Sequence, residues 1–285
     1  MSNCGTPSYM GIAHGAKSDI GLKRTQNEDR LCIDSSLGLY MVCDGMGGHN
    51  AGEVASGLAV EVIQKHLLEG RQDTRAPIIG HYDASFLSQT NRLASAIRLA
   101  NHAIHCEAQQ RTEYARMGTT VVSALISGQV LSFAHVGDSR LYLIRDQTIQ
   151  LLTRDHSLVM EQIQDGLLTE EEAERSAQRH IVTRALGIEA TVDVEMGELP
   201  MINGDVLLLC SDGLTRGVSS RDIVRAVHDH PDLHTASDRL ITLANAAGGE
   251  DNTTVILVTC QNRRGPPVWH WIRNLICRRE TRVWN

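Results

Sequence analysis

Residues 39–56, LYMVCDGMGGHNAGEVAS, are the stretch that most strongly constrains the fold. Five apolar residues run up to Asp44-Gly45, and a glycine-rich turn and a segment of helical periodicity follow, which predicts a buried strand, a turn and a helix. A phosphate-cradling loop has a similar outline. However, no Lys-Ser/Thr follows Gly48, and the glycine spacing matches neither the P-loop nor the dinucleotide fingerprint. An aspartate at the strand end instead indicates a cation site.

Length, charge and cysteine spacing narrow the class of protein. The 285 residues, 42% of them apolar, suffice for one large α/β domain or two small ones. The formal net charge of -7 gives no reason to expect nucleic acid as a partner. Seven scattered cysteines without a Cys-x-x-Cys pair are typical of buried, reduced thiols in a cytosolic protein. We expect no secretion signal and no transmembrane span, because no stretch reaches the roughly 18 apolar residues required.

Clusters of short strands, with helices in a pair between them, predict an α+β layered architecture. Helical periodicity is clear at 52–68 and 92–106. The polar residues 156–190 indicate a small helical insertion, with Thr169 as the N-cap before three glutamates. The expected strands are the β-rich runs LGLYMVCD, GTTVVSALIS, QVLSFAHVGD, RLYLIRD, DVLLLCSD and NTTVILVTC.

The C-terminal segment 263–285 has a different composition from the rest of the chain. It holds all three tryptophans and six arginines against one glutamate, about +5, which leaves about -12 for the remainder. Its apolar residues fall at helical spacing with arginines between them, a pattern typical of helices that bind anionic membrane surfaces or acidic partner grooves. The alternative is a terminal segment without a docking role, either disordered or packed on the domain.

Four aspartates stand at predicted strand ends: Asp44, Asp138, Asp212 and Asp251. A single Asp-Gly after a strand usually marks an ordinary turn. Four such residues are better explained by a shared cation site, because an ionised carboxylate at the edge of an apolar core costs several kcal/mol unless it is paired. Oxygen ligands without a histidine or cysteine cluster favour Mg²⁺ or Mn²⁺ over Zn²⁺.

Hard divalent ions of this kind support phosphate chemistry. A water that bridges two of them is acidified towards hydroxide and can attack a phosphate ester in line. Arg24 offers a planar cation that can hold phosphate oxygens. A serine hydrolase is not expected, because no G-x-S-x-G elbow surrounds Ser139 or Ser211. Arg140, Arg184 and Arg216 are expected to pair with flap carboxylates, with assistance in phosphate binding as the alternative. We expect His135 and His156 to be structural or solvated residues, and Thr119 and Thr120 to be β-branched residues of a buried strand.

Eight motifs resemble, in this order, the bacterial metal-dependent serine/threonine protein phosphatases of type 2C (the PPM family): GLKRTQNED, VCDGMGGHNAGEVAS, MGTTVV, HVGDSRLYL, TRDHS, RALG, LLLCSDGLTR and GGEDNTTVILV. The resemblance covers about residues 10–260. It implies a four-layer αββα sandwich, two packed and mainly antiparallel sheets flanked by helices, with a mobile flap at about 156–190. It also implies a phosphatase domain at 1–262, two Mn²⁺ or Mg²⁺ ions with a third expected, and hydrolysis of phosphoserine and phosphothreonine in proteins.

The resemblance assigns a role to each matching residue. Asp44 would bridge the two metals, and Gly45 would bind one of them through its carbonyl. Asp212 and Asp251 would bind the other ion, and Asp138 with Asp212 would form the third-metal site. The remaining assignments are Glu28 and Asp29, which would act through coordinated waters, and Arg24, which would hold the substrate phosphate.

Met46 departs from the eukaryotic pattern, in which a histidine follows the Asp-Gly and protonates the leaving alkoxide. A thioether cannot donate a proton. Protonation must then come from metal-bound water, from solvent or from another acid. His49 is the histidine of this loop and a candidate acid, although a solvated turn residue is the simpler interpretation.

The resemblance also implies partners. We expect phosphorylated proteins as substrates, a cognate Ser/Thr kinase that the protein opposes, a monomer, and a cytoplasmic location with a peripheral association at the inner membrane through 263–285. The alternative is a phosphoprotein-binding regulator without turnover, acting through its basic tail. No motif specifies the pathway; type VI secretion signalling is one setting in which stand-alone members occur.

Overall fold

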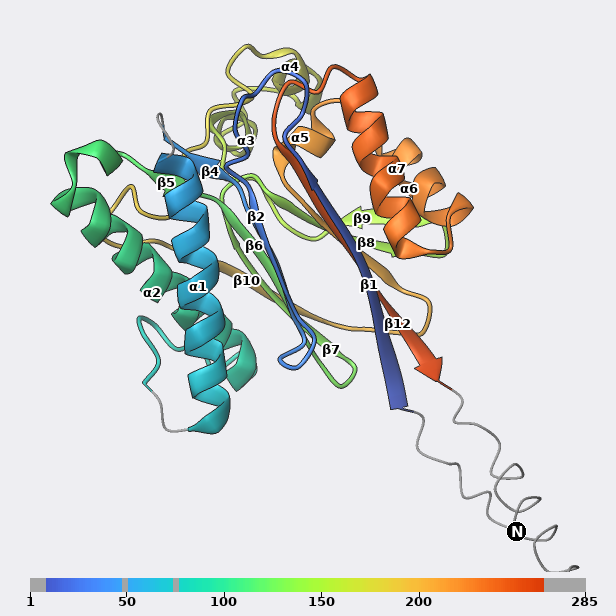
Figure 1. Ribbon diagram of the computed structural model, residues 1–285, viewed down its shortest axis with the longest axis horizontal. Coiled ribbons are helices and arrows are strands. Elements are labelled where there is room, and N and C mark those ends of the chain that lie inside the picture. Colours follow the sequence, from blue (N-terminus) through green and yellow to red (C-terminus); the bar gives the residue numbers. More distant parts are fainter. Residues whose placement is uncertain (1–8, 48–50, 74–76, 264–285) are drawn as a thin grey trace, which may run out of the picture.

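A computed structural model describes residues 9–47, 51–73 and 77–263. His49 and the segment 264–285 lie outside the described residues. Figure 1 shows two packed β-sheets with helices on their outer faces. This is the predicted four-layer αββα sandwich, and the fold class is confirmed. None of the helices formed by the described residues is long and apolar enough to cross a bilayer.

Each large sheet has five antiparallel strands. The first sheet has the order β1 (Tyr9–Asp19), β12 (Thr253–Arg263), β11 (Val206–Cys210), β8 (Arg140–Arg145) and β9 (Thr148–Leu151). The second has the order β10 (Glu195–Pro200), β7 (Val130–Val136), β6 (Val121–Ser127), β3 (Leu39–Cys43) and β2 (Arg30–Asp34). A short pair at the end of the second sheet comprises β4 (Gly45–Met46) and β5 (Gly118–Thr119).

The helices divide between the two outer faces (Figure 1). The second sheet is covered by α1 (Ala51–Gln72) and α2 (Ser88–Gln110), and η1 (Thr112–Tyr114) follows α2. The first sheet is covered by α6 (Ser220–Asp229) and α7 (Leu233–Ala246), with the short α5 (Asp212–Thr215) before them. The insertion contains α3 (Leu158–Gln164) and α4 (Glu170–Arg175).

The opening strand β3 shows why the central strands are continuously apolar. All five of its residues are buried. Leu39, Met41 and Cys43 pack towards α1 and α2, whereas Tyr40 and Val42 belong to the core between the sheets. Because successive side chains of a strand point to opposite faces, a strand covered on both faces needs apolar residues at every position.

The structure extends and corrects the predicted elements. Both long helices exceed the periodic stretches, and β1, β2, β9, β10, α6 and α7 were not predicted. Strand β1, for example, has a sparse apolar pattern but pairs along its whole length with β12, a contact between opposite ends of the chain. The cap at Thr169 is confirmed, because its Oγ1 accepts a hydrogen bond from Glu172 N and Glu172 Oε2 accepts one from Thr169 N. All five cysteines of the described residues are free, and four are buried.

Candidate metal centre

The four predicted aspartates come together where corresponding ends of the two sheets meet. Asp44 follows β3 and Asp138 follows β7 in the second sheet, while Asp212 follows β11 and Asp251 precedes β12 in the first. All four line one cavity of about 280 Å³. The same cavity is lined by Arg24, Glu28, Gly45, Met46, Gly47, Thr120, His180, Val182, Arg216 and Asn252. Segments far apart in the sequence thus bring like charges onto one surface.

Burial, together with repulsion from neighbouring carboxylates, raises the pKa of three of these aspartates, Asp44, Asp138 and Asp212. Removal from water and then the repulsion of Asp29, Asp212 and Asp138 raise the pKa of Asp44 well above its usual range. Burial, with repulsion from Asp212, raises the pKa of Asp138 to about 7. The pKa of Asp212 is also raised by burial, although Arg216 offsets part of the effect. A group of carboxylates in this state is stabilised by any cation that enters among them.

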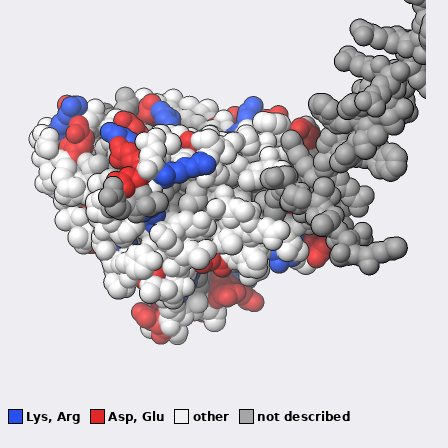
Figure 2. Space-filling model, turned by 90° about the horizontal axis from the view of Figure 1, so that it is seen from below, with Lys and Arg blue, Asp and Glu red and all other residues white. Residues whose placement is uncertain are grey.

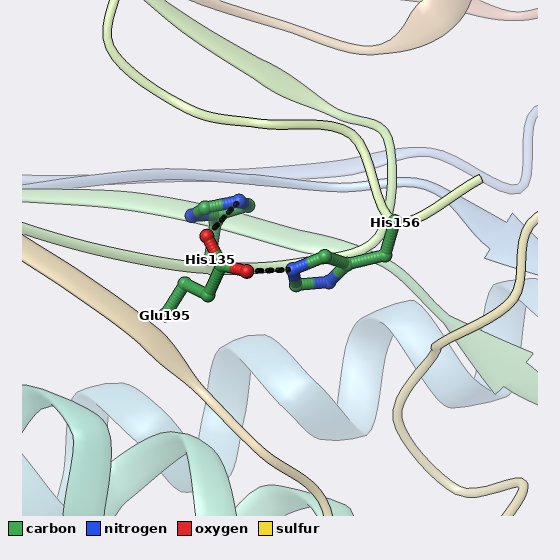
Figure 3. Close-up of side chains that lie close together, drawn as sticks. All are labelled: His135, His156 and Glu195. Atoms are coloured by element: carbon green, nitrogen blue, oxygen red, sulfur yellow. Dashed lines mark ion pairs between the residues drawn. The ribbon is translucent and has the colours of Figure 1, made fainter. Parts of the chain in front are cut away.

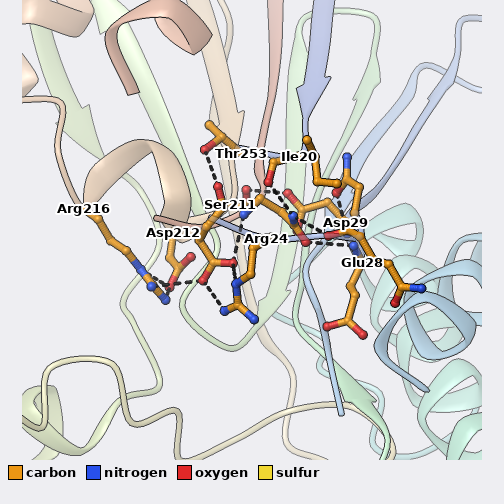
Figure 4. A network of polar contacts seen from close by, with 12 residues as sticks. Ile20, Arg24, Glu28, Asp29, Ser211, Asp212, Arg216 and Thr253 are labelled. Atoms are coloured by element: carbon orange, nitrogen blue, oxygen red, sulfur yellow. Dashed lines mark hydrogen bonds and ion pairs between the residues drawn. The ribbon is translucent and has the colours of Figure 1, made fainter. Parts of the chain in front are cut away.

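Two arginines supply part of the missing positive charge (Figure 4). Arg24 binds Asp251 through Nε at 2.9 Å and through Nη2 at 2.9 Å. Arg216 binds Asp212 through Nε at 2.9 Å and Asp251 through Nη1 at 3.0 Å. Arg216 therefore pairs with carboxylates of the site itself, and the predicted alternative of flap carboxylates is wrong.

The donors fit a hard divalent ion. Asp212 Oδ1 is buried without a hydrogen-bond partner in the described part of the chain. Because the carboxylates of four aspartates line the cavity, the site suits Mg²⁺ or Mn²⁺. Gly45 belongs to this wall, and a Cβ at this position would lie 2.2 Å from the carbonyl oxygen of Gly52. Only glycine permits the strand end and α1 to approach so closely.

Glu28 and Asp29 lie at different depths. Glu28 lines the cavity, and its backbone N donates to Asn252 Oδ1 at 2.8 Å. Asp29 is 2% exposed, does not line the cavity, and accepts a hydrogen bond from Ser211 Oγ at 2.8 Å through Oδ2. Burial raises the pKa of Asp29 to about 7. Ser211 thus supports a buried carboxyl group behind the cavity wall, and its surroundings contain no nucleophile-activating pattern.

The hydroxyl groups of Thr119 and Thr120 hold the backbone of Asp44 in place, a role that their sequence pattern did not predict. Thr119 Oγ1 donates to Asp44 O at 2.9 Å, and Asp44 N donates to Thr120 Oγ1 at 3.1 Å. The Thr120 hydroxyl also lies 2.7 Å from Ser139 Oγ, beside Asp138. The β-branched shape of these threonines is therefore only part of their role. The motif MGTTVV contained the signal, but the partners of its hydroxyl groups lie far away in the sequence.

A second missed residue is Asn252. Its Nδ2 donates to Ile20 O at 3.0 Å and to Gln26 O at 2.8 Å, while its Oδ1 accepts from Glu28 N. One buried amide thus fixes the loop that carries Arg24 and Glu28. The flap contributes His180 and Val182 to the cavity, and neither was singled out from the sequence.

The other residues weighed from the sequence have defined partners. Arg140 binds Asp155 through Nε at 2.9 Å and Nη2 at 2.7 Å, away from the cavity. Arg184 Nη1 lies 3.3 Å from His156 Nε2 and donates to Asp193 O at 3.4 Å. His135 and His156 are 2% and 5% exposed, so the alternative of solvated histidines is wrong and the structural one holds. Met46 lines the cavity, as its position beside Asp44 predicts.

Comparison with known proteins identifies the class. The sequence model described as Protein phosphatase 2C matches residues 23–246. The serine/threonine phosphatase stp of Listeria monocytogenes is 36% identical over 245 residues, which cover 85% of this chain and 93% of that protein. The crystal structure of the Mycobacterium tuberculosis serine/threonine phosphatase PstP/Ppp matches with a TM-score of 0.78 and 34% identity, covering 89% of this chain and 100% of that one. The PstP catalytic domain in complex with 2 manganese ions matches with a TM-score of 0.72 and 35% identity over the same shares.

An αββα sandwich with carboxylates gathered where its sheets meet is the framework of a metal-dependent hydrolase. The comparisons narrow this class, because the family match spans most of the chain and the Listeria relative is aligned over nearly its whole length. The chain belongs to the protein phosphatase 2C family. It is a metal-dependent serine/threonine protein phosphatase, as its motifs predict.

Proposed function

We propose that Asp44, Gly45, Asp212 and Asp251 hold two Mn²⁺ or Mg²⁺ ions for the hydrolysis of phosphoserine and phosphothreonine in proteins. The observation that carries this proposal is the convergence of aspartates from both sheets on one cavity, with Asp212 Oδ1 buried and unpartnered among the described residues. The PstP structure with 2 manganese ions supports the number and kind of ion. When bound, such ions supply an activated water and offset the charge that develops on the phosphate.

Each residue of the cavity has a proposed task. Asp44, which is repelled by Asp29, Asp212 and Asp138, would be shared by the two ions, and Gly45 would contribute its carbonyl. Asp138 with Asp212 holds a third, weaker ion. Glu28 faces the cavity and orients waters, whereas Asp29 supports the wall from behind through Ser211.

Arg24 is proposed to bind the substrate phosphate. It lies at the cavity rim with a side chain that is 52% exposed, and its guanidinium fork already holds a carboxylate in the bidentate manner that also suits phosphate. Once a cation offsets the charge of Asp251, the Arg24 side chain is available for the substrate. Arg216 is more enclosed and is proposed to steady Asp212 and Asp251.

Protonation of the leaving alkoxide cannot come from Met46, whose thioether has no proton to donate. The two proposed proton donors are a water molecule and His49. His180 of the flap is the histidine that lines the cavity in the described part of the chain, and it provides a matched control for His49.

The proposed partners and location rest on the amino-acid composition of the chain and on its resemblance to the phosphatase family. We propose a phosphatase domain at 1–262, a flap at about 156–190 that selects substrates, and a monomer that opposes a cognate Ser/Thr kinase in the cytoplasm. Basic and acidic side chains are interspersed on the face that Figure 2 shows. The concentrated basic charge of 263–285 is therefore proposed to dock on the inner membrane surface or on an acidic partner.

The test is hydrolysis of p-nitrophenyl phosphate and of a phosphothreonine peptide with Mn²⁺, with EDTA, and by the variants Asp44→Asn and Asp251→Asn. We expect turnover that requires Mn²⁺ and both carboxylates. Turnover that survives EDTA or both substitutions would refute the two-ion site. The alternative, a phosphoprotein-binding regulator without turnover, predicts peptide binding but no hydrolysis by the wild-type protein under any metal condition.

A further inference from the structure

The buried His135 and His156 and the partly exposed Glu195 form a cluster beside the Asp138 turn and outside the metal-centre cavity (Figure 3). We propose that His156 is a positioning residue that couples the base of the flap to the turn carrying Asp138. This inference rests on the proposed function, because Asp138 acts only if it helps to hold an ion.

His156 binds the Asp138 turn through both backbone polar groups of Gly137. Gly137, which precedes Asp138, has a φ of +105°, and a Cβ there would lie 2.6 Å from Thr120 Cγ2. The backbone N of His156 donates to Gly137 O at 3.0 Å, and the His156 ring accepts a hydrogen bond from Gly137 N through Nδ1 at 3.0 Å. His156 therefore satisfies both backbone polar groups of the residue that sets the direction of Asp138.

The same residue closes the base of the flap. His156 O accepts from Thr183 N at 2.9 Å, Ser157 forms a β-bridge with Val182, and Leu158 N donates to Ile181 O at 2.9 Å. Val182 also lines the metal-centre cavity. The backbone of His156 is thus bound to the returning end of the flap while its ring is bound to the Asp138 turn. A displacement at the flap base therefore reaches this turn through one residue, by its backbone N–H and by its ring.

The His156 ring is held in one tautomer by its neighbours. Because Nδ1 accepts from Gly137 N, the neutral ring carries its proton on Nε2, which donates to Glu195 Oε1 at 3.1 Å. Glu195 is in turn held by Arg154 Nη2 at 3.0 Å. His135 stacks on the ring with centroids 4.9 Å apart and planes inclined by 18°. These contacts fix the position and the rotation of the imidazole.

A metal ion held by the three residues is the competing explanation, since their potential ligand atoms lie within 4.8 Å of one another. Binding through His156 Nε2 would move the ring proton to Nδ1, where it would face the N–H of Gly137. His135 Nε2 is also committed, because it donates to Arg154 O at 2.8 Å. Both nitrogens that face Glu195 therefore already carry protons, and hydrogen bonds hold this face of the cluster without an ion.

The test compares His156→Asn with His156→Gln. An Asn Oδ1 can take the place of Nδ1 and accept from Gly137 N, whereas the longer Gln reaches towards Glu195 and leaves that N–H without its acceptor. Mn²⁺ binding is measured by calorimetry, and amide hydrogen exchange is followed over residues 157–182. Asp138→Asn is the matched control, which removes the carboxyl group but leaves the flap base intact.

We expect His156→Gln to weaken the most weakly bound Mn²⁺ at least tenfold and to speed exchange at the flap base, with the tighter ions unaffected. His156→Asn should restore both properties. Asp138→Asn should lose the weak ion while flap exchange stays at the wild-type rate. Equal behaviour of the Asn and Gln variants, or unchanged flap exchange in His156→Gln, would overturn the positioning role. A wild-type protein that binds no Mn²⁺ would refute the proposed function itself. An additional ion, bound by the wild type beyond those of the metal centre and lost in Glu195→Gln, would overturn the positioning role in favour of a metal site at His135, His156 and Glu195.

Discussion

Two neighbouring clusters of ionisable side chains show that proximity alone does not make a metal site. Around Asp44 four aspartates face only two arginines among the described residues that line the cavity, burial and repulsion raise the pKa of Asp44, and Asp212 Oδ1 has no partner in the same part of the chain. Around Glu195 the two imidazoles donate to a carboxylate and a carbonyl, and only His135 Nδ1 is unpartnered within the described chain. The first cluster needs a cation to become stable, whereas the second is already satisfied by its own protons.

The largest expected effect comes from removing the central charge of the first cluster. Asp44→Asn should lower turnover by more than the roughly 10–100-fold that changes behind the ligands cost. In EDTA the same variant should melt at a higher temperature than the wild type, because it removes a carboxyl group whose pKa is raised by removal from water and by its neighbours. Turnover and melting temperature are measured with Mn²⁺ and with EDTA. A variant that loses stability in EDTA would contradict the repulsion described for this cluster.

Substitution of His49 tests which group donates the proton to the leaving alkoxide. If His49 protonates the leaving alkoxide, His49→Ala should lower kcat by on the order of 10²-fold for an aryl phosphate with a poor leaving group. The alkaline limb of the pH profile of kcat should flatten with it, because a general acid acts only in its protonated form. His180→Ala, which alters the cavity from the flap, should keep that limb. The reverse pattern would place the acid on the flap, and two unchanged limbs would leave water as the proton source.

Substitution of Thr120 tests how far Mn²⁺ binding at the metal centre depends on the hydroxyl group that accepts a hydrogen bond from Asp44 N. Thr120→Val keeps the side-chain shape but leaves Asp44 N without its acceptor, a loss of about 1–3 kcal/mol for a buried donor. We expect a roughly 10–100-fold weaker response to Mn²⁺, measured as the concentration giving half-maximal turnover. Thr120→Ser is the control that keeps the hydroxyl. Equal responses of the Val and Ser variants would show that the β-branched shape is what matters.

The two clusters should respond oppositely to pH in the metal-free protein. A folded-state pKa of about 7 for Asp138, against 3.8 normally, means that its contribution to stability is present at low pH and is lost as pH rises through about 7. Burial, followed by repulsion from His135, lowers the pKa of His156 to about 4, so its contribution is lost as pH falls from about 6.5 towards 4. In EDTA, Asp138→Asn should raise the melting temperature by about 2–4 °C at pH 8 and less at pH 5. An equal gain in melting temperature at both pH values would contradict a raised pKa for Asp138.

The smallest effect on chemistry is expected from the terminal segment, which lies outside both clusters. Deletion of 263–285 should leave turnover of a small aryl phosphate within about twofold of the wild type, since none of its residues belongs to the eight family motifs. Binding to anionic liposomes should be lost in a sedimentation assay. A charge-matched variant with its tryptophans replaced separates docking by the apolar face from simple attraction of the arginines. Undiminished liposome binding by the truncated protein would rule out the docking role.

Part of this molecule could be predicted from local sequence. The apolar runs ending in aspartate locate β3 and β11, and the four carboxylates of the cavity follow from those ends together with the Gly-Asp and Glu-Asp turns. By contrast, β1 and β10 lack a dense apolar pattern. They are strands because backbone hydrogen bonds to β12 and β7 satisfy them, and those partners are distant along the chain.

The sequence alone determined which residues are carboxylates, which strand ends bear them, and that Met46 stands where a proton donor might have been. Only the tertiary structure decided which partner each polar group has. It pairs Arg216 with Asp212, places the Thr120 hydroxyl under Asp44, and directs the ring of His156 at the Gly137 turn. The physical reason is that charge and strand propensity are local properties of a residue, whereas a pKa and a hydrogen bond depend on neighbours brought together by the packing of two sheets.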